Sequence, residues 1–140
     1  MNMTISRRRG AMAAIVALLV TFGATAPASA ATLNNCADGY MCLWRDTSYK
    51  TNGLTSDNIR LQAKIPNLTS YNWAAGGSAN DSVTSITNNG MTSDAYVYTN
   101  ASGGGSALPV AKGDGRPNRI FWDPSFNDTI SSAKFVGVNW

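Results

Sequence analysis

Two stretches of the chain share one pattern: Asn80-Asp81-Ser82-Val83-Thr84-Ser85 and Asn127-Asp128-Thr129-Ile130-Ser131-Ser132. Each consists of Asn, Asp, any residue, an aliphatic residue, Ser or Thr, and Ser. The two copies begin 47 residues apart, a spacing that suits equivalent points in tandem structural units. The pattern therefore predicts a domain with a duplicated motif.

Both stretches supply the oxygen atoms that a hard cation prefers. Calcium takes about six to eight oxygens from carboxylates, carbonyls, hydroxyls and water. One copy holds too few ligands, so we expect the copies to face each other and to exchange hydroxyls, which gives two paired calcium sites. A single copy is better explained as ordinary turn chemistry before a strand, but a matched pair favours the metal. The candidate ligands are the carboxylates of Asp81 and Asp128, the hydroxyls of Thr84 and Ser131, and the backbone carbonyls of Ser82 and Thr129.

The six-residue pattern resembles the calcium-binding signature of microbial βγ-crystallins. The resemblance implies an all-β fold, a βγ-crystallin-like sandwich of two Greek-key motifs, with one copy of the signature in each. The turn signal Asn88-Asn89-Gly90 marks the expected boundary. We therefore expect one unit over residues 34–89 and the other over residues 90–140, both approximate.

Residues 1–30 have the features of a secretory signal peptide. Arg7 to Arg9 form the charged start, residues 11–22 are an apolar run too short to span a bilayer, and Ala28-Ser29-Ala30 is a small-residue cleavage site. An uncleaved membrane anchor is the alternative. No later apolar stretch has spanning length. We expect a secreted, extracellular protein with one domain over residues 31–140 and no membrane contact after cleavage.

Removal of the signal peptide changes the charge balance. The chain has 11 Lys plus Arg and 8 Asp plus Glu, but three of the basic residues are Arg7 to Arg9. The remainder is neutral, so its charge gives no reason to expect a nucleic-acid partner. Few charges among many Asn, Ser, Thr and Gly residues are typical of a turn-rich all-β domain, which we expect to be a monomer.

Two cysteines, Cys36 and Cys42, are separated by five residues. In an exported protein this spacing favours one disulfide across a small loop, with Asp38-Gly39 as the turn. Closing that loop contributes roughly 2 kcal/mol in the chain-entropy model. A zinc site is a poor alternative, because the chain has no histidine. The aromatic and apolar residues of Tyr40 to Trp44 predict a strand directly after the loop.

Aromatic residues mark the expected opening of each unit. Crystallin units open with an aromatic, four residues, a second aromatic, one residue and a Gly; Trp44 and Tyr49 have this aromatic spacing, and Gly53 follows later. Tyr96 and Tyr98 open the second unit, which lacks the second aromatic and has a run of glycines instead. We assign these aromatic residues to the core or to corners.

Taken together, these features are similar to those of a family of small secreted bacterial peptidase inhibitors, typified by a metalloproteinase inhibitor. The likeness covers most of residues 34–136 and implies a peptidase as partner. The typical inhibitor holds its inhibitory loop with a second disulfide whose cysteines are missing here, so that site cannot be transferred. The corresponding region is roughly residues 107–112, where Leu108 or Val110 is the candidate to enter an apolar pocket.

The remaining segments have weaker signals. Ser56-Asp57 can cap a short helix through Ile59 and Leu61, although an irregular crossover fits equally well. Alternation predicts a strand over Val83 to Thr87, and the apolar residues Ile130, Ala133, Phe135 and Val138 indicate a last strand at the end of the chain.

The composition argues against an enzyme. The chain has neither histidine nor glutamate, which removes Ser/His and Cys/His dyads, zinc hydrolase sites and glutamate bases. Paired aspartates of a glycosidase or an aspartic protease and a Ser-Lys nucleophile stay open, but a cation is the simpler partner for Asp81 and Asp128 and no motif supports a Ser-Lys pair. Two non-enzymatic functions are the main expectations. The first is a secreted, non-enzymatic peptidase inhibitor on a calcium-binding scaffold. The second is a calcium-stabilised structural or cell-envelope binding module without inhibitory activity.

Overall fold

The computed structural model describes residues 35–51, 53–54, 57–116 and 123–140. The expected signal peptide and part of the segment before the second motif lie outside these ranges. Within them, no helix has the length and apolar character needed to cross a bilayer.

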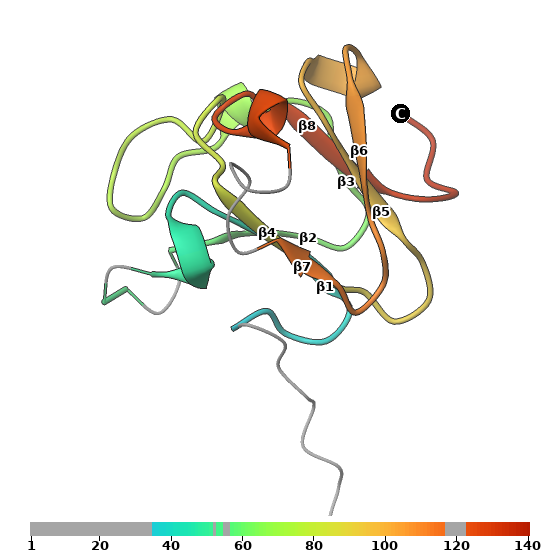
Figure 1. The fold of residues 1–140 in the computed structure, drawn as a ribbon, viewed down its shortest axis with the longest axis horizontal. Coiled ribbons are helices and arrows are strands. Elements are labelled where there is room, and N and C mark those ends of the chain that lie inside the picture. Colours follow the sequence, from blue (N-terminus) through green and yellow to red (C-terminus); the bar gives the residue numbers. More distant parts are fainter. Residues whose placement is uncertain (1–34, 52, 55–56, 117–122) are drawn as a thin grey trace, which may run out of the picture.

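Antiparallel strands of the described residues form two four-stranded sheets (Figure 1). Four single-turn 3-10 helices in the described residues connect them: η1 (Thr47–Tyr49), η2 (Leu68–Ser70), η3 (Ala101–Gly103) and η4 (Pro124–Phe126). The strands are β1 (Tyr40–Trp44), β2 (Ile59–Leu61), β3 (Lys64–Ile65), β4 (Ser85–Asn89), β5 (Ala95–Tyr98), β6 (Ala107–Val110), β7 (Gly115–Arg116) and β8 (Ser132–Phe135).

The two halves of the chain exchange one strand. The strand orders are β2-β1-β4-β7 and β3-β8-β5-β6, so β3 of the first half joins the second sheet and β7 of the second half joins the first. Each half thus contributes its first, second and fourth strands to one sheet and its third strand to the other. This is a duplicated Greek-key arrangement, and it confirms the predicted all-β sandwich of two such motifs.

The core lies between the inner faces of both sheets. Met41 and Leu43 of β1, Ile86 of β4 and Val97 of β5 are completely buried in one cluster. Their alternation with residues of the outer face follows the two-residue period of a strand. Burial of this apolar surface is the main stabilising term of the fold.

Of the two expectations for the segment before Pro66, the short helix through Ile59 and Leu61 is wrong. Ile59 and Leu61 are buried while Arg60 between them is exposed, which is strand periodicity. They pair with Leu43 and Met41 of β1, and this pairing outweighs the local capping signal. The strand predicted over Val83 to Thr87 is present as β4 but begins and ends two residues later, and the strand predicted over residues 130–138 is present as the shorter β8.

Each half has one aromatic corner, beside the end of β1 or β5. In the first, the rings of Trp44 and Tyr49 meet edge to face with centroids 5.2 Å apart. In the second, Tyr98 meets Trp140 in the same way at 5.4 Å. Gly103 occupies the place of Tyr49, and a Cβ atom there would collide with the Trp140 ring. The C-terminal Trp140 therefore supplies the aromatic ring that the second unit lacks at this point in its sequence.

The last serine of each motif fastens the corner of its own half. The Ser85 hydroxyl donates to the Asp46 carbonyl over 2.6 Å and accepts from the Tyr49 amide over 3.3 Å. Ser132 donates to the Asn100 carbonyl over 2.6 Å and accepts from the Gly103 amide over 3.1 Å. The repeat thus extends from sequence to individual hydrogen bonds.

Candidate functional site

The structure brings the two motifs face to face. The Ser131 hydroxyl donates to Oδ1 of Asp81 over 3.0 Å, and the Thr84 hydroxyl donates to Oδ1 of Asp128 over 3.3 Å. Each carboxylate thus meets the hydroxyl of the other motif, as the sequence pattern predicts. The result is two equivalent clusters of oxygen atoms, each shared between the halves of the molecule.

The backbone and a neighbouring amide hold each carboxylate in place. Asp81 and Asp128 have left-handed φ angles of 54° and 52°. Asn80 Nδ2 donates to Asp81 Oδ2 over 2.7 Å, and Asn127 Nδ2 donates to Asp128 Oδ2 over 2.8 Å. The side-chain carbonyl oxygens of both asparagines are buried and have no hydrogen-bond partner in the described part of the chain. Buried polar atoms normally have partners, so these two oxygens remain available for one.

The other predicted ligand residues brace the loops through their side chains. The Ser82 hydroxyl donates to the Ser78 carbonyl over 2.7 Å, and the Thr129 hydroxyl donates to the Ser125 carbonyl over 2.8 Å. These equivalent bonds occupy the two hydroxyls, so a contribution to a cation from Ser82 or Thr129 would come from the backbone, as predicted.

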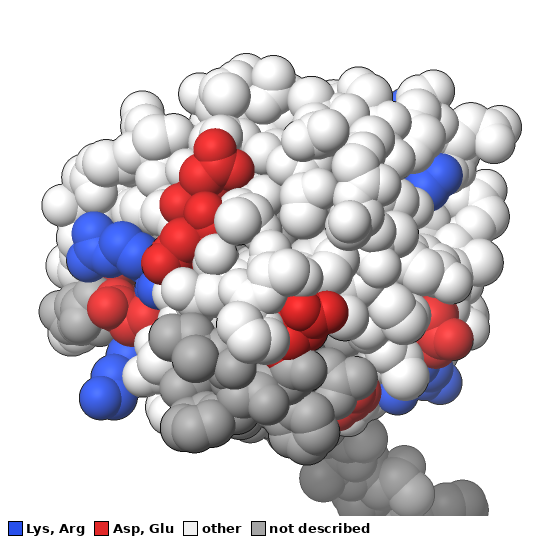
Figure 2. All heavy atoms as spheres, turned by 45° about the horizontal axis from the view of Figure 1, so that its top comes forward, with Lys and Arg blue, Asp and Glu red and all other residues white. Residues whose placement is uncertain are grey.

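The donor set suits calcium better than a transition metal. Among the described residues, no three His, Cys, Asp or Glu side chains converge, and each cluster contributes one carboxylate with neutral oxygens. Hard cations prefer such oxygens, whereas zinc prefers nitrogen and sulfur. Asp81 and Asp128 are exposed to solvent. On the face shown in Figure 2, acidic side chains form a short row on a mostly uncharged surface.

The proposed inhibitory residues Leu108 and Val110 do not lie in an exposed loop. Both belong to strand β6, which pairs with β5 at the edge of its sheet. Val110 is completely buried, and Leu108 packs partly buried against the core. The assignment is wrong for Val110, whose buried side chain cannot enter a pocket of another protein, and Leu108 belongs to a strand that packs against the core rather than to an exposed loop.

A different segment presents an exposed apolar side chain. The turn of residues 90–94, called the β4–β5 turn, joins the two sheets (Figure 1). Its Met91 is 72% exposed, more than any other large apolar residue in the described part of the chain. In the sequence, Asn88-Asn89-Gly90 marks this region only as the boundary between the two units. The sequence feature that could have indicated an exposed contact residue is the single methionine among the polar residues of this turn.

Asn88 holds the β4–β5 turn from inside. Its side chain is completely buried. Nδ2 donates to the carbonyls of Ser93 over 3.1 Å and Val110 over 3.0 Å, while Oδ1 accepts from the Gly90 amide over 2.9 Å. Gly90 lies so close to Phe135 that a Cβ atom would collide with the ring. Met91 therefore projects from a turn whose two ends are both fixed.

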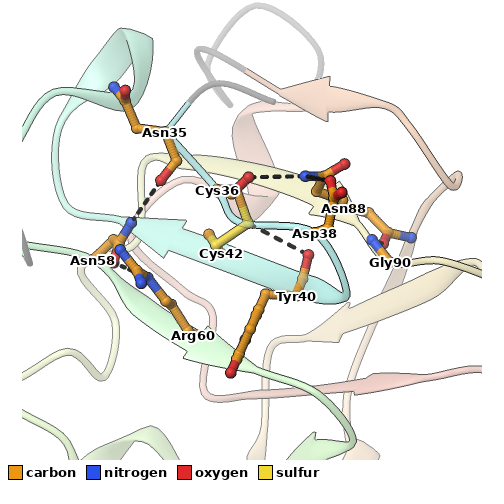
Figure 3. Close-up of a disulfide and its surroundings, with 10 residues drawn as sticks. Asn35, Cys36, Asp38, Tyr40, Cys42, Asn58, Arg60, Asn88 and Gly90 are labelled. Atoms are coloured by element: carbon orange, nitrogen blue, oxygen red, sulfur yellow. Dashed lines mark hydrogen bonds between the residues drawn. A yellow bond between two sulfur atoms is a disulfide. The ribbon is translucent and has the colours of Figure 1, made fainter. Parts of the chain in front are cut away.

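The disulfide loop supports the same turn from outside (Figure 3). The predicted bond between Cys36 and Cys42 is present, with Cα atoms 5.8 Å apart. Asn89 Nδ2 donates to the Cys36 carbonyl over 2.8 Å and to Asp38 Oδ1 over 3.0 Å. The Gly39 amide donates to the Asn89 carbonyl over 2.8 Å. The small covalent loop is thereby tied to the last residue before the β4–β5 turn.

The far end of the turn is anchored at Asp94. Its carboxylate accepts from the Lys112 amide over 2.8 Å, and its carbonyl accepts from the Val136 amide over 2.9 Å. Beside the turn is an open hollow of about 340 Å³. Its apolar wall includes Met91, Phe135, Val136 and Val138. A protruding side chain next to an apolar depression is a surface suited to contact with another protein.

Several solved structures with a similar fold are βγ-crystallin domains. A structure from a study of the evolution of the eye-lens βγ-crystallin domain fold has a TM-score of 0.57 and 18% identity, covering 76% of this chain and 93% of its own. A βγ-crystallin from Ciona intestinalis has a TM-score of 0.53 and 22% identity, covering 69% and 99%. An archaeal βγ-crystallin has a TM-score of 0.51 and 14% identity, covering 71% and 99%. These likenesses show the fold, and they confirm the predicted βγ-crystallin-like architecture.

No curated protein is detectably similar to the chain in sequence. The sequence model of peptidase inhibitor family I36 matches residues 29–108. The match covers more than half of the chain and includes the disulfide loop, the first motif and the whole β4–β5 turn. The chain belongs to peptidase inhibitor family I36 and carries its domain on a βγ-crystallin-like fold.

Proposed function

We propose that this protein is a secreted, non-enzymatic peptidase inhibitor that binds its target through the β4–β5 turn and is stiffened by two calcium ions. The observation that carries the proposal is Met91, an exposed apolar side chain on a turn fixed at both ends, within the segment that matches the inhibitor family. The apparent signal peptide supports secretion.

Rigidity is the property that makes a turn suitable for inhibition. A flexible loop loses roughly 1–2 kcal/mol of backbone entropy per residue when a partner orders it. The β4–β5 turn is already ordered in the free protein by the contacts of Asn88, the disulfide loop and Asp94, so binding a partner loses less backbone entropy. An uncharged, apolar Met91 suits peptidases with an apolar specificity pocket, and not those whose pocket is acidic.

The test is a titration of purified protein against secreted metallo- and serine peptidases with apolar pockets. We expect slowed hydrolysis at micromolar inhibitor or below. Met91→Ala should weaken inhibition at least about tenfold, in line with the loss of one central apolar anchor. Tyr71→Ala is the matched control, because Tyr71 is also an exposed large apolar residue but precedes the first motif. Equal inhibition by both variants would refute the role of the turn.

Calcium acts on the scaffold in this proposal and does not contact the target. The first motif precedes β4, whereas the β4–β5 turn follows it, so the two lie at opposite ends of that strand. Asp81 with Ser131 and Asp128 with Thr84 would each hold one ion, helped by backbone carbonyls and water. A ligand present at 100 times its Kd stabilises a fold by about 2.7 kcal/mol. Thermal melting with and without calcium should show such a gain, and the double change Asp81→Ala and Asp128→Ala should abolish it.

A second candidate function is a calcium-stabilised structural or cell-envelope binding module. The crossed pairing of carboxylates and hydroxyls favours it independently of the turn. It predicts a calcium-dependent melting temperature together with no inhibition of any peptidase in the panel. The two experiments above therefore separate the candidates.

A further inference from the structure

The mature part of the chain contains two methionines in opposite environments. Three of the five methionines lie within residues 1–30, which leaves Met41 and Met91. Met41 belongs to strand β1, and its side chain is completely buried in the core. Met91 is 72% exposed at the β4–β5 turn. Oxidation of methionine depends on access to the sulfur, so Met91 should react readily with an oxidant. The buried Met41 should react slowly and can serve as an internal control for selectivity.

We propose that Met91 is an oxidative modification site at which peroxides switch off peptidase binding. In this step the sulfur of Met91 attacks a peroxide, the O–O bond breaks, and one oxygen atom bonds to Sδ. Sulfur loses two electrons, and the second peroxide oxygen leaves as water or, from an organic peroxide, as an alcohol. The product is methionine sulfoxide, which is polar and chiral where the thioether was apolar.

The position of Met91 makes this change consequential for binding and harmless to the fold. Phe135, Val136 and Val138 form an apolar wall of the hollow beside Met91, and the polar residues Gln62, Thr92 and Ser93 also line it. A partner that covers the apolar wall removes Met91 from water. A sulfoxide oxygen covered there without a hydrogen-bond donor lowers affinity by roughly ten- to a hundredfold. The bonds that fix the turn come from Asn88, Asp94 and the backbone, and none comes from the Met91 side chain.

This inference rests on the proposed function of the β4–β5 turn, and its test separates the two. The mature protein is treated with hydrogen peroxide, and the oxidised residue is located by peptide mass mapping. We expect Met91 to gain one oxygen while Met41 stays unmodified and the melting temperature is unchanged. Inhibition of a susceptible peptidase should fall at least tenfold, and methionine sulfoxide reductases should restore it.

Met91→Leu is the matched variant, because leucine keeps an apolar side chain of similar volume without sulfur. Its own inhibition constant before treatment serves as the reference, and peroxide should leave that constant unchanged. Full inhibition by protein oxidised at Met91, or oxidation of Met41 before Met91, would overturn the switch and leave the proposed inhibitor function intact. If untreated protein inhibits no peptidase, the proposed function and the switch both fail.

Discussion

Replacement of Asn88 by alanine tests how the fold supports the β4–β5 turn. The change removes three hydrogen bonds, to Ser93, Val110 and Gly90, all within a buried site. At about 1 kcal/mol for each bond, we expect a loss of roughly 3 kcal/mol of stability. For a domain of this size that corresponds to a melting temperature about 10 °C lower, or more.

The same change should weaken inhibition through disorder of the turn. If two residues of the turn become flexible when free, ordering them on binding costs roughly 2–4 kcal/mol. The inhibition constant should then rise by at least about tenfold, measured well below the melting temperature. Met91→Ala provides the contrast, because it should weaken inhibition while the melting temperature stays the same. An Asn88→Ala protein with unchanged stability and unchanged inhibition would refute the reasoning.

Three further predictions concern the calcium clusters and the corners. Asp81→Ala should reduce the calcium stoichiometry in calorimetry from two ions to one, because each cluster has its own carboxylate. Trp140→Ala should cost about 1–2 kcal/mol in chemical denaturation, since its ring, although 39% exposed, packs edge to face against Tyr98 and lies beneath the Lys134 ammonium group. Ser132→Ala should destabilise the protein by about 1–2 kcal/mol through its corner bonds, and Ser85→Ala should match it within error.

Local patterns were sufficient to predict the duplicated architecture. The two motifs identify equivalent points of the repeat, and the disulfide is determined because Cys36 and Cys42 are the only two cysteines in the sequence. The first strand is visible because Tyr40 to Trp44 is a continuous aromatic and apolar run. These features depend on neighbours in the sequence, so the sequence alone displays them.

Features set by distant contacts could not be predicted. The pairing of Tyr98 with Trp140 joins a strand to the C-terminus, and nothing near Tyr98 in the sequence signals it. Strand β2 has three residues, too few for its period to outweigh a capping signal. Leu108 and Val110 were chosen only because they lie in the region that corresponds to the inhibitory loop, and no local pattern showed that this region forms strand β6. Exposure of Met91 depends on how the turn emerges between the sheets, which no local pattern reveals.

A specificity swap at Met91 tests the central claim most directly. Met91→Arg places a positive charge at the tip of the turn without altering the buried contacts of Asn88 or the disulfide loop. The inhibition constant is measured against one peptidase with an apolar pocket and one with an acidic pocket. We predict that the variant loses inhibition of the first and gains inhibition of the second. Unchanged inhibition of both enzymes would contradict the assignment of the β4–β5 turn as the inhibitory element.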